Sequence, residues 1–348
     1  MQRCTACSSG TMLPSLSRWV EAFWYRHSPY AVLLQPLAWL FQAAVWLRIL
    51  AFRIGLRKQV RLPVPVVIVG NLTVGGTGKT PVVIWLADCL TRAGYRPGIV
   101  SRGYGGRRRG DAVGVTATSD PDEVGDEPVV IARRTACPVW VARNRARAAQ
   151  ILVEQGADII LADDGLQHYG LCRDFEIVVI DGARGLGNGR MLPAGPLREP
   201  AARLREVDLV LINGQGNDAI AGHRFRLVAD GTLNLDGRHR PLSEFSGRQV
   251  WAVAGIGNPS GFLQTLEAAG IMSQVIPVPD HGRVPLAELQ ASDRRPVLMT
   301  EKDAVKYVGL CDQDVWYVPV HVEIASKDVE SELTAQVISG CGFTNTDG

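Results

Sequence analysis

The sequence predicts an α/β protein built on a mostly parallel sheet with helices on both faces. Short apolar runs of strand length alternate with helix-like segments over most of the 348 residues, and this alternation is typical of parallel strands joined by crossover helices. One such run starts at Val66 and passes into a glycine-rich turn and then a helix-like segment. The length predicts about two domains, and a hydrophobic content of 46% is ample for their cores.

Charge and cysteine content argue against several classes of protein. The net charge is only +2, so composition makes no case for nucleic acid as a partner. The seven cysteines are scattered, and the C-x-x-C pair of Cys4 and Cys7 has no matching second pair. We therefore expect neither a zinc site nor a disulfide framework, and a reducing cytosol fits this pattern.

Residues 1–65 form an aromatic and basic segment unlike the rest of the chain. Half of the eight tryptophans lie here, and Ser28–Leu47 is a charge-free run of 20 residues, close to the length of a membrane span. Pro36 interrupts the run and basic residues flank both ends, so we expect a helix that lies in the membrane interface. A core helix of the first domain is the alternative.

The stretch Val66–Cys89 has the order strand, glycine-rich loop and helix that a nucleotide phosphate requires. Lys79 is expected to follow the β- and γ-phosphates, and the Thr80 hydroxyl to bind Mg²⁺. Thr73 stands where the common G-x-x-x-x-G-K-[ST] pattern has glycine, so a glycine-rich turn without a ligand is the alternative. We predict a P-loop NTPase-like domain with these nucleotide-binding residues: Gly75, Gly76, Thr77, Gly78, Lys79 and Thr80.

Asp163 is a candidate for metal binding, and Asp126 is a second carboxylate at the edge of a predicted element. Asp163 ends a short apolar run, an arrangement that presents a carboxylate to Mg²⁺ beside a P-loop, although an ordinary turn has the same pattern. Asp126 lies ahead of a helix, where a helix cap is the ordinary interpretation. Asp164, Gln167 and His168 follow Asp163 closely enough to adjoin the same site.

Two glycine-rich loops carry arginines. The loop after the strand ending at Ser101 contains the run Arg107–Arg109, which is either a solvated loop or a ligand contact at the end of a strand. Arg198, in the glycine- and proline-rich loop Asn188–Glu199, is available as a bidentate phosphate clamp.

A change of pattern near residue 225 predicts the join between two domains. Two short strand-like runs flank Asp230 and Gly231, which is a hairpin signal. An αβ pattern then resumes, and we interpret Gly255-x-Gly257 as the turn of a smaller α/β unit rather than a dinucleotide site. The predicted parts are a membrane-associating segment 1–65, a P-loop domain 66–224, a hairpin-like linker 225–245 and a smaller C-terminal α/β domain 246–348.

Taken together, the motifs resemble one family, the tetraacyldisaccharide 4′-kinases, which are the lipid A kinases of Gram-negative bacteria. The matching blocks lie in the order that the family has them, over about residues 16–340. They are VGNLTVGGTGKTP, SRGYGG, VGDEP, DDGLQH, FEIVVIDGARGLGNGRMLPAGPLRE, PDH and LMTEKDAVK.

The resemblance implies transfer of the ATP γ-phosphate to the 4′-hydroxyl of a tetraacyl disaccharide 1-phosphate, with Mg²⁺. It places the enzyme at the cytoplasmic face of the inner membrane, peripheral or shallowly inserted, and implies no protein partner. By the same resemblance, Asp126 takes the hydroxyl proton with support from His281, and Asp163 binds the metal. Further positions near nucleotide or substrate are Tyr104, Asp164, Gln167, His168, Arg145, Arg198 and Glu199.

Two other functions stay open at this point. A membrane-associated P-loop ATPase switch that recruits a partner shares the GG-x-GKT pattern, but such switches carry a lysine before the two glycines, where this chain has Val74. A cytosolic small-molecule kinase is disfavoured by the aromatic N-terminal segment.

Overall fold

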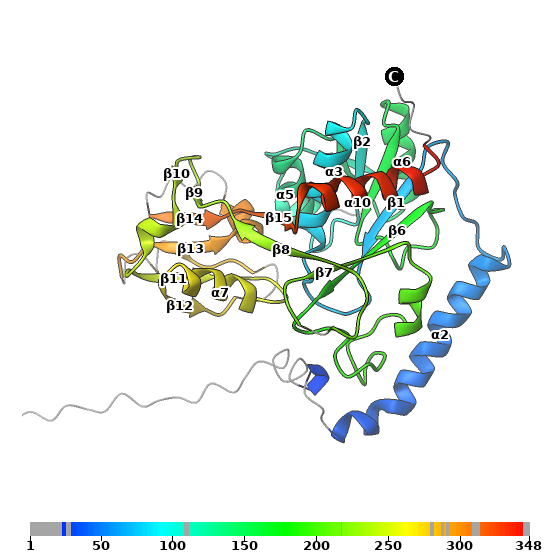
Figure 1. Cartoon of the computed structure of the whole chain (residues 1–348), viewed down its shortest axis with the longest axis horizontal. Helices are drawn as coiled ribbons and strands as arrows, with labels where there is room; N and C mark the ends of the chain where they lie inside the picture. Colours follow the sequence, from blue (N-terminus) through cyan, green and yellow to red (C-terminus); the bar gives the residue numbers. More distant parts are fainter. Residues whose placement is uncertain are drawn as a thin grey trace, which may run out of the picture.

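The computed structural model describes residues 23–25, 29–107, 111–216, 218–278, 282–286, 289, 293–307 and 314–343. The described strands form a nine-stranded and a six-stranded sheet, each with helices packed on it (Figure 1). We call the nine-stranded sheet with its helices the first lobe, and the six-stranded sheet with its helices the second lobe. The α/β class predicted from the alternation of apolar runs is confirmed.

The sheet of the first lobe has the strand order β15-β8-β7-β6-β1-β5-β2-β4-β3. Pairings from β8 to β4 are parallel, while β15 and β3 are antiparallel edge strands. The bounds are β1 Val66–Gly70, β2 Pro97–Ser101, β3 Val113–Val115, β4 Val139–Val141, β5 Ile159–Asp163, β6 Phe175–Asp181, β7 Leu209–Asn213, β8 His223–Ala229 and β15 Val320–Ile324.

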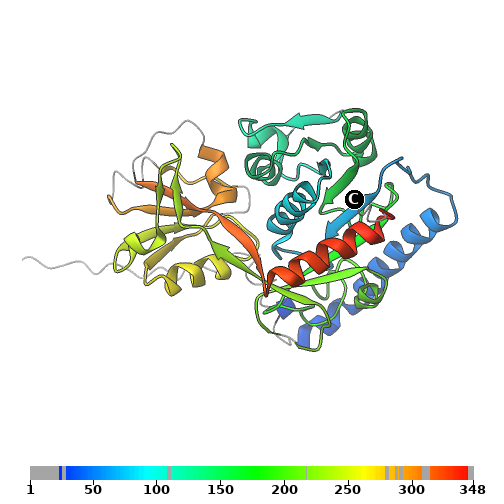
Figure 2. The same cartoon turned by 45° about the horizontal axis from the view of Figure 1, so that its top comes forward.

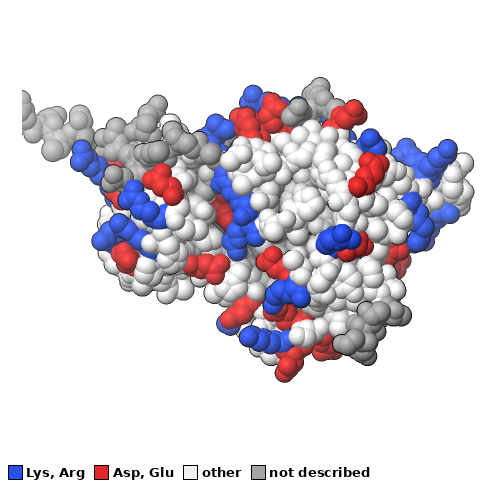
Figure 3. Space-filling view, turned by 90° about the horizontal axis from the view of Figure 1, so that it is seen from above, with Lys and Arg blue, Asp and Glu red and all other residues white. Residues whose placement is uncertain are grey.

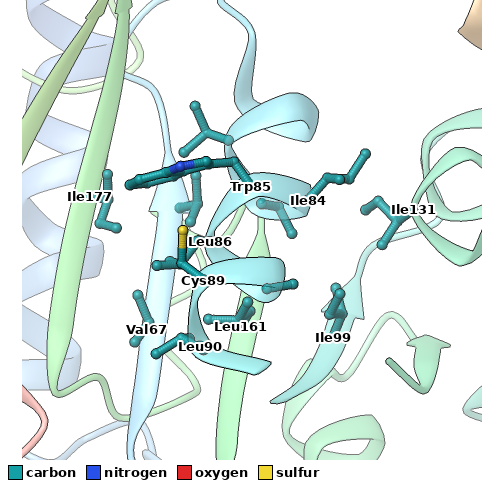
Figure 4. Packing of buried hydrophobic residues seen from close by; sticks show 14 of the residues in the cluster. Val67, Ile84, Trp85, Leu86, Cys89, Leu90, Ile99, Ile131, Leu161 and Ile177 are labelled. Carbon is teal, nitrogen blue, oxygen red and sulfur yellow. The ribbon is translucent and has the colours of Figure 1, made fainter. Parts of the chain in front are cut away.

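Helices cover both faces of this sheet because successive residues of a central strand point into two different cores. In β1, Val67 and Val69 belong to the core that includes α3, α5 and α10, whereas Val66 and Ile68 belong to the core that includes α6. Figure 4 shows α3 lying along the sheet, with Leu90 beside Val67. The helices are α2 Gln35–Arg53, α3 Lys79–Arg92, α4 Pro121–Val124, α5 Asp126–Arg134, α6 Arg145–Glu154, η2 Ala201–Arg205 and α10 Lys327–Gly340, with η1 Pro29–Leu34 before α2.

The sheet of the second lobe has the order β10-β9-β14-β13-β11-β12. Its four strands from β14 to β12 are parallel, and β9 and β10 are antiparallel additions at one edge. The bounds are β9 Thr232–Asn234, β10 His239–Arg240, η3 Leu242–Phe245, β11 Gln249–Val253, α7 Ser260–Ala268, β12 Met272–Ile276, β13 Val297–Thr300, α9 Glu301–Ala304, η4 Val305–Tyr307 and β14 Val315–Val318.

The chain passes between the lobes twice. The predicted hairpin about Asp230 and Gly231 is wrong, because β8 pairs within the first lobe whereas β9 pairs with β14 and β10 in the second. Gly231 has a φ of 92°, so the turn signal marks a change of sheet. On the return, β15 pairs antiparallel with β8, and α10 lies across the first lobe beside α3 (Figures 1 and 2). Residues 320–343 therefore lie on the first lobe, and the predicted domain limits stay a proposal.

Helix α2 lies along the outside of the first lobe (Figure 1). Ala38 is its single buried residue, and large apolar side chains such as Leu40 and Trp46 are 68% and 60% exposed. The alternative of a core helix is therefore wrong. The stretch Tyr30–Arg53 is long and apolar enough to cross a membrane. Length and composition of one helix near the N-terminus do not by themselves establish a span.

Charged side chains of both signs are interspersed on the face drawn in Figure 3. On that face, Lys and Arg side chains gather along the boundary between the smaller second lobe and the larger first lobe. The boundary matters because residues of both lobes line the main cavity of the described chain.

Candidate functional site

A cavity of about 1880 Å³ lies where the two lobes meet the P-loop. Its wall combines the start of α3, the loop after β5, one side of α2 and the loop after β11. Thirteen residues predicted from the sequence line it: Gly75, Gly76, Thr77, Gly78, Lys79, Thr80, Tyr104, Arg145, Asp164, Gln167, His168, Arg198 and Glu199.

The P-loop connects β1 directly to α3, which begins at Lys79. Gly75 and Gly78 have φ values of 109° and 96°, a backbone conformation that favours glycine. The first amides of α3 have no partner within the helix, so they are donors for an anion at the cavity. Thr73, which departs from the usual motif, is buried and bridges to Leu197.

Asp163 ends β5 beside β1, in register with Val69. The Ser101 hydroxyl donates to Asp163 Oδ2 at 3.3 Å, while Oδ1 is buried without a hydrogen-bond partner among the described residues. Burial, with the nearby carboxylates of Glu127 and Asp164, raises the pKa of Asp163 to about 7. A cation at Oδ1 would relieve this cost, because it favours the ionised form.

Asp164 is the carboxylate that faces the cavity. Its φ of 49° places it in the left-handed region, which is unfavourable for a side-chain-bearing residue and is often found at functional sites. Lys79 Nζ lies 3.4 Å from Oδ1 and Arg198 Nη1 lies 3.6 Å from Oδ2. Burial raises the pKa of Asp164, whereas the positive charges of Lys79, Arg198 and Arg145 lower it. The cations outweigh the burial, so the pKa lies below its ordinary value.

These two carboxylates suit Mg²⁺ bound together with a nucleotide. Within the described ranges, no three His, Cys, Asp or Glu side chains cluster as a complete metal site. Mg²⁺ is commonly held by one or two carboxylates together with phosphate oxygens and water, rather than by a full protein cage. The unpartnered Oδ1 of Asp163, beside a P-loop, fits that donor set.

Arginines surround the same part of the cavity. The Arg145 side chain is buried, and its Nη2 donates to the Asp164 carbonyl at 2.9 Å. Arg102 and Arg143 also line the wall, although neither was singled out from the sequence. Cations at this density favour a ligand with several negative charges, such as a polyphosphate.

A hydrogen-bond network fixes the segment after Asp164. Gln167 Nε2 donates to the Asn71 carbonyl at 3.2 Å and to Glu199 Oε1 at 3.1 Å, and the Tyr169 hydroxyl donates to Glu199 Oε2 at 2.8 Å. Burial and the surrounding arginines lower the pKa of His168 to about 4. His168 therefore stays neutral near pH 7 in this setting.

Asp126 is the first residue of α5, is 4% exposed and does not line the cavity. The N-cap is Gly125 and no side chain caps this helix, so the cap interpretation of Asp126 is wrong. Lys306 Nζ lies 3.4 Å from Asp126 Oδ2. The predicted partner of Asp126, His281, lies outside the described residues.

The second lobe supplies site residues that the sequence interpretation missed. Gly257 and Asn258 line the cavity, and a Cβ on Gly257 would lie 2.7 Å from the Gly76 amide. Asn258 Nδ2 donates to Asp181 Oδ2 at 2.7 Å, which links the two lobes. Asp181 could have been found from the sequence, because a carboxylate that ends an apolar strand is a recognisable pattern. Nothing local in Gly255-x-Gly257 indicates a contact with the P-loop.

Comparison with known proteins gives one consistent family. The family model for LpxK, tetraacyldisaccharide-1-P 4′-kinase, matches residues 30–338. A tetraacyldisaccharide 4′-kinase of Alkalilimnicola ehrlichii is 52% identical over 311 residues, which are 86% of this chain and 92% of the relative. One of Methylobacillus flagellatus is 47% identical over 314 residues, or 89% of this chain and 93% of the relative.

A solved structure of the family has the same fold. The crystal structure of LpxK from Aquifex aeolicus in complex with ATP matches with a TM-score of 0.74 at 28% identity, covering 89% of this chain and 99% of that one. Sequence and structure thus agree over nearly the whole of both proteins. We conclude that the chain belongs to the tetraacyldisaccharide-1-P 4′-kinase family.

Proposed function

We propose that this protein transfers the γ-phosphate of ATP to the 4′-hydroxyl of a tetraacyl disaccharide 1-phosphate, the reaction of lipid A 4′-phosphorylation. The observation that carries the proposal is the composition of one cavity. The P-loop and its arginines line one part of the wall, and Phe41, Val45 and Arg48 of α2 line another. A nucleotide site that opens beside an apolar helix suits a phosphate acceptor with acyl chains.

The P-loop amides, Lys79 and Thr80 are placed to bind the ATP phosphates and their metal. Asp163 and Thr80 are the residues that we assign to Mg²⁺, which when bound neutralises charge on the phosphate oxygens. Arg145 and Arg198 hold Asp164 by its carbonyl and its carboxylate. Both arginines line the cavity, where the transferred phosphoryl group would gain stabilisation from their positive charge.

Asp126 is the group to which we assign the acceptor's proton. A sugar hydroxyl needs a base as it attacks. The bond between the 4′-oxygen and the γ-phosphorus forms while the bond from that phosphorus to the β,γ-bridging oxygen breaks. The hydroxyl proton passes to the Asp126 carboxylate, and ADP leaves with the bonding electron pair. We assign His281 to support this carboxylate.

The membrane surface is the place where such a substrate is found. The exposed apolar side chains of α2 and its flanking basic residues suit the interface of an anionic bilayer. We therefore propose a peripheral or shallowly inserted enzyme at the cytoplasmic face of the inner membrane. Neither a partner-recruiting ATPase switch nor a cytosolic kinase for a small soluble substrate is favoured, because the family match extends over residues 30–338.

Phosphate transfer to two acceptors tests the proposal. Purified protein with Mg²⁺ and ³²P-labelled ATP is given either the tetraacyl disaccharide 1-phosphate in detergent micelles or a soluble disaccharide. We expect label in the lipid and little in the soluble sugar. ATP hydrolysis that proceeds equally without any acceptor would instead support the switch, and equal labelling of both acceptors would remove α2 from the substrate site.

A further inference from the structure

We propose that Lys306 is a positioning residue for this reaction: its buried ammonium group holds the Asp126 carboxylate in place and ties it to the second lobe. The inference rests on the proposed function, since it concerns the residue to which the acceptor's proton is assigned. Lys306 belongs to the LMTEKDAVK block, and none of the roles derived from the sequence included it.

The ammonium of Lys306 lies among three oxygen atoms. Its Nζ is 2.9 Å from Asp303 Oδ1, 3.1 Å from the Gly282 carbonyl and 3.4 Å from Asp126 Oδ2. The contacts with Asp303 and Gly282 are hydrogen bonds, and the contact with Asp126 is an ion pair. The Lys306 and Asp303 side chains are each 1% exposed and that of Asp126 is 5% exposed. Water therefore screens these charges little.

Asp303 holds Lys306 from the side of the second lobe. The Oδ2 atom of Asp303 accepts from the Gly255 amide at 2.8 Å and from the Thr300 hydroxyl at 2.6 Å. Thr300 ends β13 and Gly255 follows β11, so this carboxylate is fixed at the ends of two parallel strands. Lys306 reaches from that fixed point to α5 of the first lobe, against which α9 and η4 pack.

The burial of the cluster argues for a role beyond stability. Lys306 lies between the carboxylates of Asp303 and Asp126, and all three side chains are at most 5% exposed. Buried ion pairs seldom add stability over apolar side chains of similar size, because each ion loses its hydration. Asp303 alone would neutralise Lys306. The contact with Asp126 gives the carboxylate a fixed orientation and a positive neighbour that favours its ionised form, which a proton acceptor requires.

A double variant that conserves the net charge of the cluster tests the role. Lys306→Met together with Asp303→Asn removes one positive and one negative charge, so the net charge of the cluster is unchanged. We expect kcat for the lipid acceptor to fall at least tenfold, with the KM for ATP within twofold of wild type and the Tm little changed. Asp303→Asn alone, which keeps Lys306 beside Asp126, should lose less activity.

A matched control lies at the same junction. Arg283, next to Gly282, pairs with Asp122 of α4 at 3.0 Å, and both side chains are about half exposed. Arg283→Met removes an ion pair between the lobes but leaves Asp126 and Lys306 alone, so its kcat should stay within twofold of wild type. A kcat within twofold for the double variant, or a fall in kcat equal to that of Arg283→Met, would overturn the positioning role.

Combination with Asp126→Asn separates this inference from the proposed function. If Lys306 acts through Asp126, adding the double variant to Asp126→Asn should lower the single-turnover rate by less than threefold. Losses that multiply would show that Lys306 serves the fold. An Asp126→Asn variant of nearly wild-type activity would overturn the assignment of Asp126 itself, whatever the Lys306 variants do.

Discussion

At the scale of single residues, two adjacent carboxylates, Asp163 and Asp164, have different surroundings. Asp164 adopts an unfavourable backbone conformation and lies against Lys79 and Arg198. Asp163, one residue earlier, is buried and short of a hydrogen-bond partner among the described residues. Adjacent carboxylates thus have opposite pKa shifts, a pattern typical of functional sites.

Lys79→Ala should lower kcat/KM for ATP by at least a hundredfold, because it removes the positive charge at the phosphates and no core volume. A hundredfold loss corresponds to about 2.7 kcal/mol of transition-state stabilisation. Steady-state kinetics with saturating acceptor measure it, and circular dichroism checks that the variant is folded. Retention of more than a tenth of the wild-type value would contradict the P-loop assignment.

His168 should make the ligand-free protein sensitive to acid. Its folded pKa of about 4 is below the value of 6.5 for an unperturbed histidine, so the unfolded chain binds the proton more readily. The stability contributed by neutral His168 is complete above pH 6.5 and is lost as the pH falls towards 4. His168→Asn, which cannot be protonated in this range, should lose less Tm between pH 7.5 and pH 5 than wild type. Equal losses in differential scanning fluorimetry would contradict the shift.

At the scale of elements, α2 is exceptional because a solvent-exposed helix carries so many large apolar side chains. Trp39 and Leu40 are each more than 60% exposed and Trp46 is 60% exposed, and patches of this kind mark interaction or membrane surfaces. The same helix contributes Phe41, Val45 and Arg48 to the cavity. One element thus presents one surface outward and another to the site.

Trp39→Ser with Trp46→Ser should move the protein from the membrane fraction towards the soluble fraction, because both side chains are about 60% exposed and neither packs in a core. Fractionation of cells followed by immunoblotting measures the shift. Met272→Ser, at a position 54% exposed on β12, is the matched control and should not change the distribution. Salt should partly extract the wild type if anionic lipids contribute; release by detergent alone would indicate a span.

At the scale of the whole molecule, the site exists because two lobes meet. The loop after β11 approaches the P-loop closely, with Gly257 against Gly76, and Asn258 donates to Asp181 across the boundary. The pairing of β15 with β8 returns the chain to the first lobe. The lobes are therefore joined by two strand connections as well as by side-chain contacts.

Gly257→Ala should raise the KM for ATP by roughly tenfold, about 1.4 kcal/mol. Its Cβ would lie 2.7 Å from the Gly76 amide, and a backbone neighbour must shift to make room, which displaces the P-loop. Gly114→Ala is the control, because the Cβ there would meet Trp140 at 3.5 Å, an ordinary contact, and neither residue lines the cavity. If both variants have wild-type KM values, the contact between the loops does not shape the nucleotide site.

Local patterns were sufficient to predict the α/β class, the P-loop and the strand ending at Asp163, because each depends on residues close together in the chain. Glycine spacing and runs of apolar residues record local backbone geometry, and they place Lys79 and Asp163 at adjacent strand ends. The resemblance of the motifs to the kinase family extended the prediction from the fold to the reaction. The roles of Asp126 and His281 stay predictions.

Tertiary structure alone decided which strands share a sheet and which distant residues meet. The residue pattern of β8 and β9 is compatible with either sheet. The sequence therefore could not show that the turn at Gly231 separates two lobes. Lys306 approaches Asp126 from another lobe, and no spacing along the chain encodes that contact. The exposure of α2 is likewise a property of what packs on it. Such contacts depend on how separately formed elements fit together, and that fit is what the folded molecule adds to the sequence.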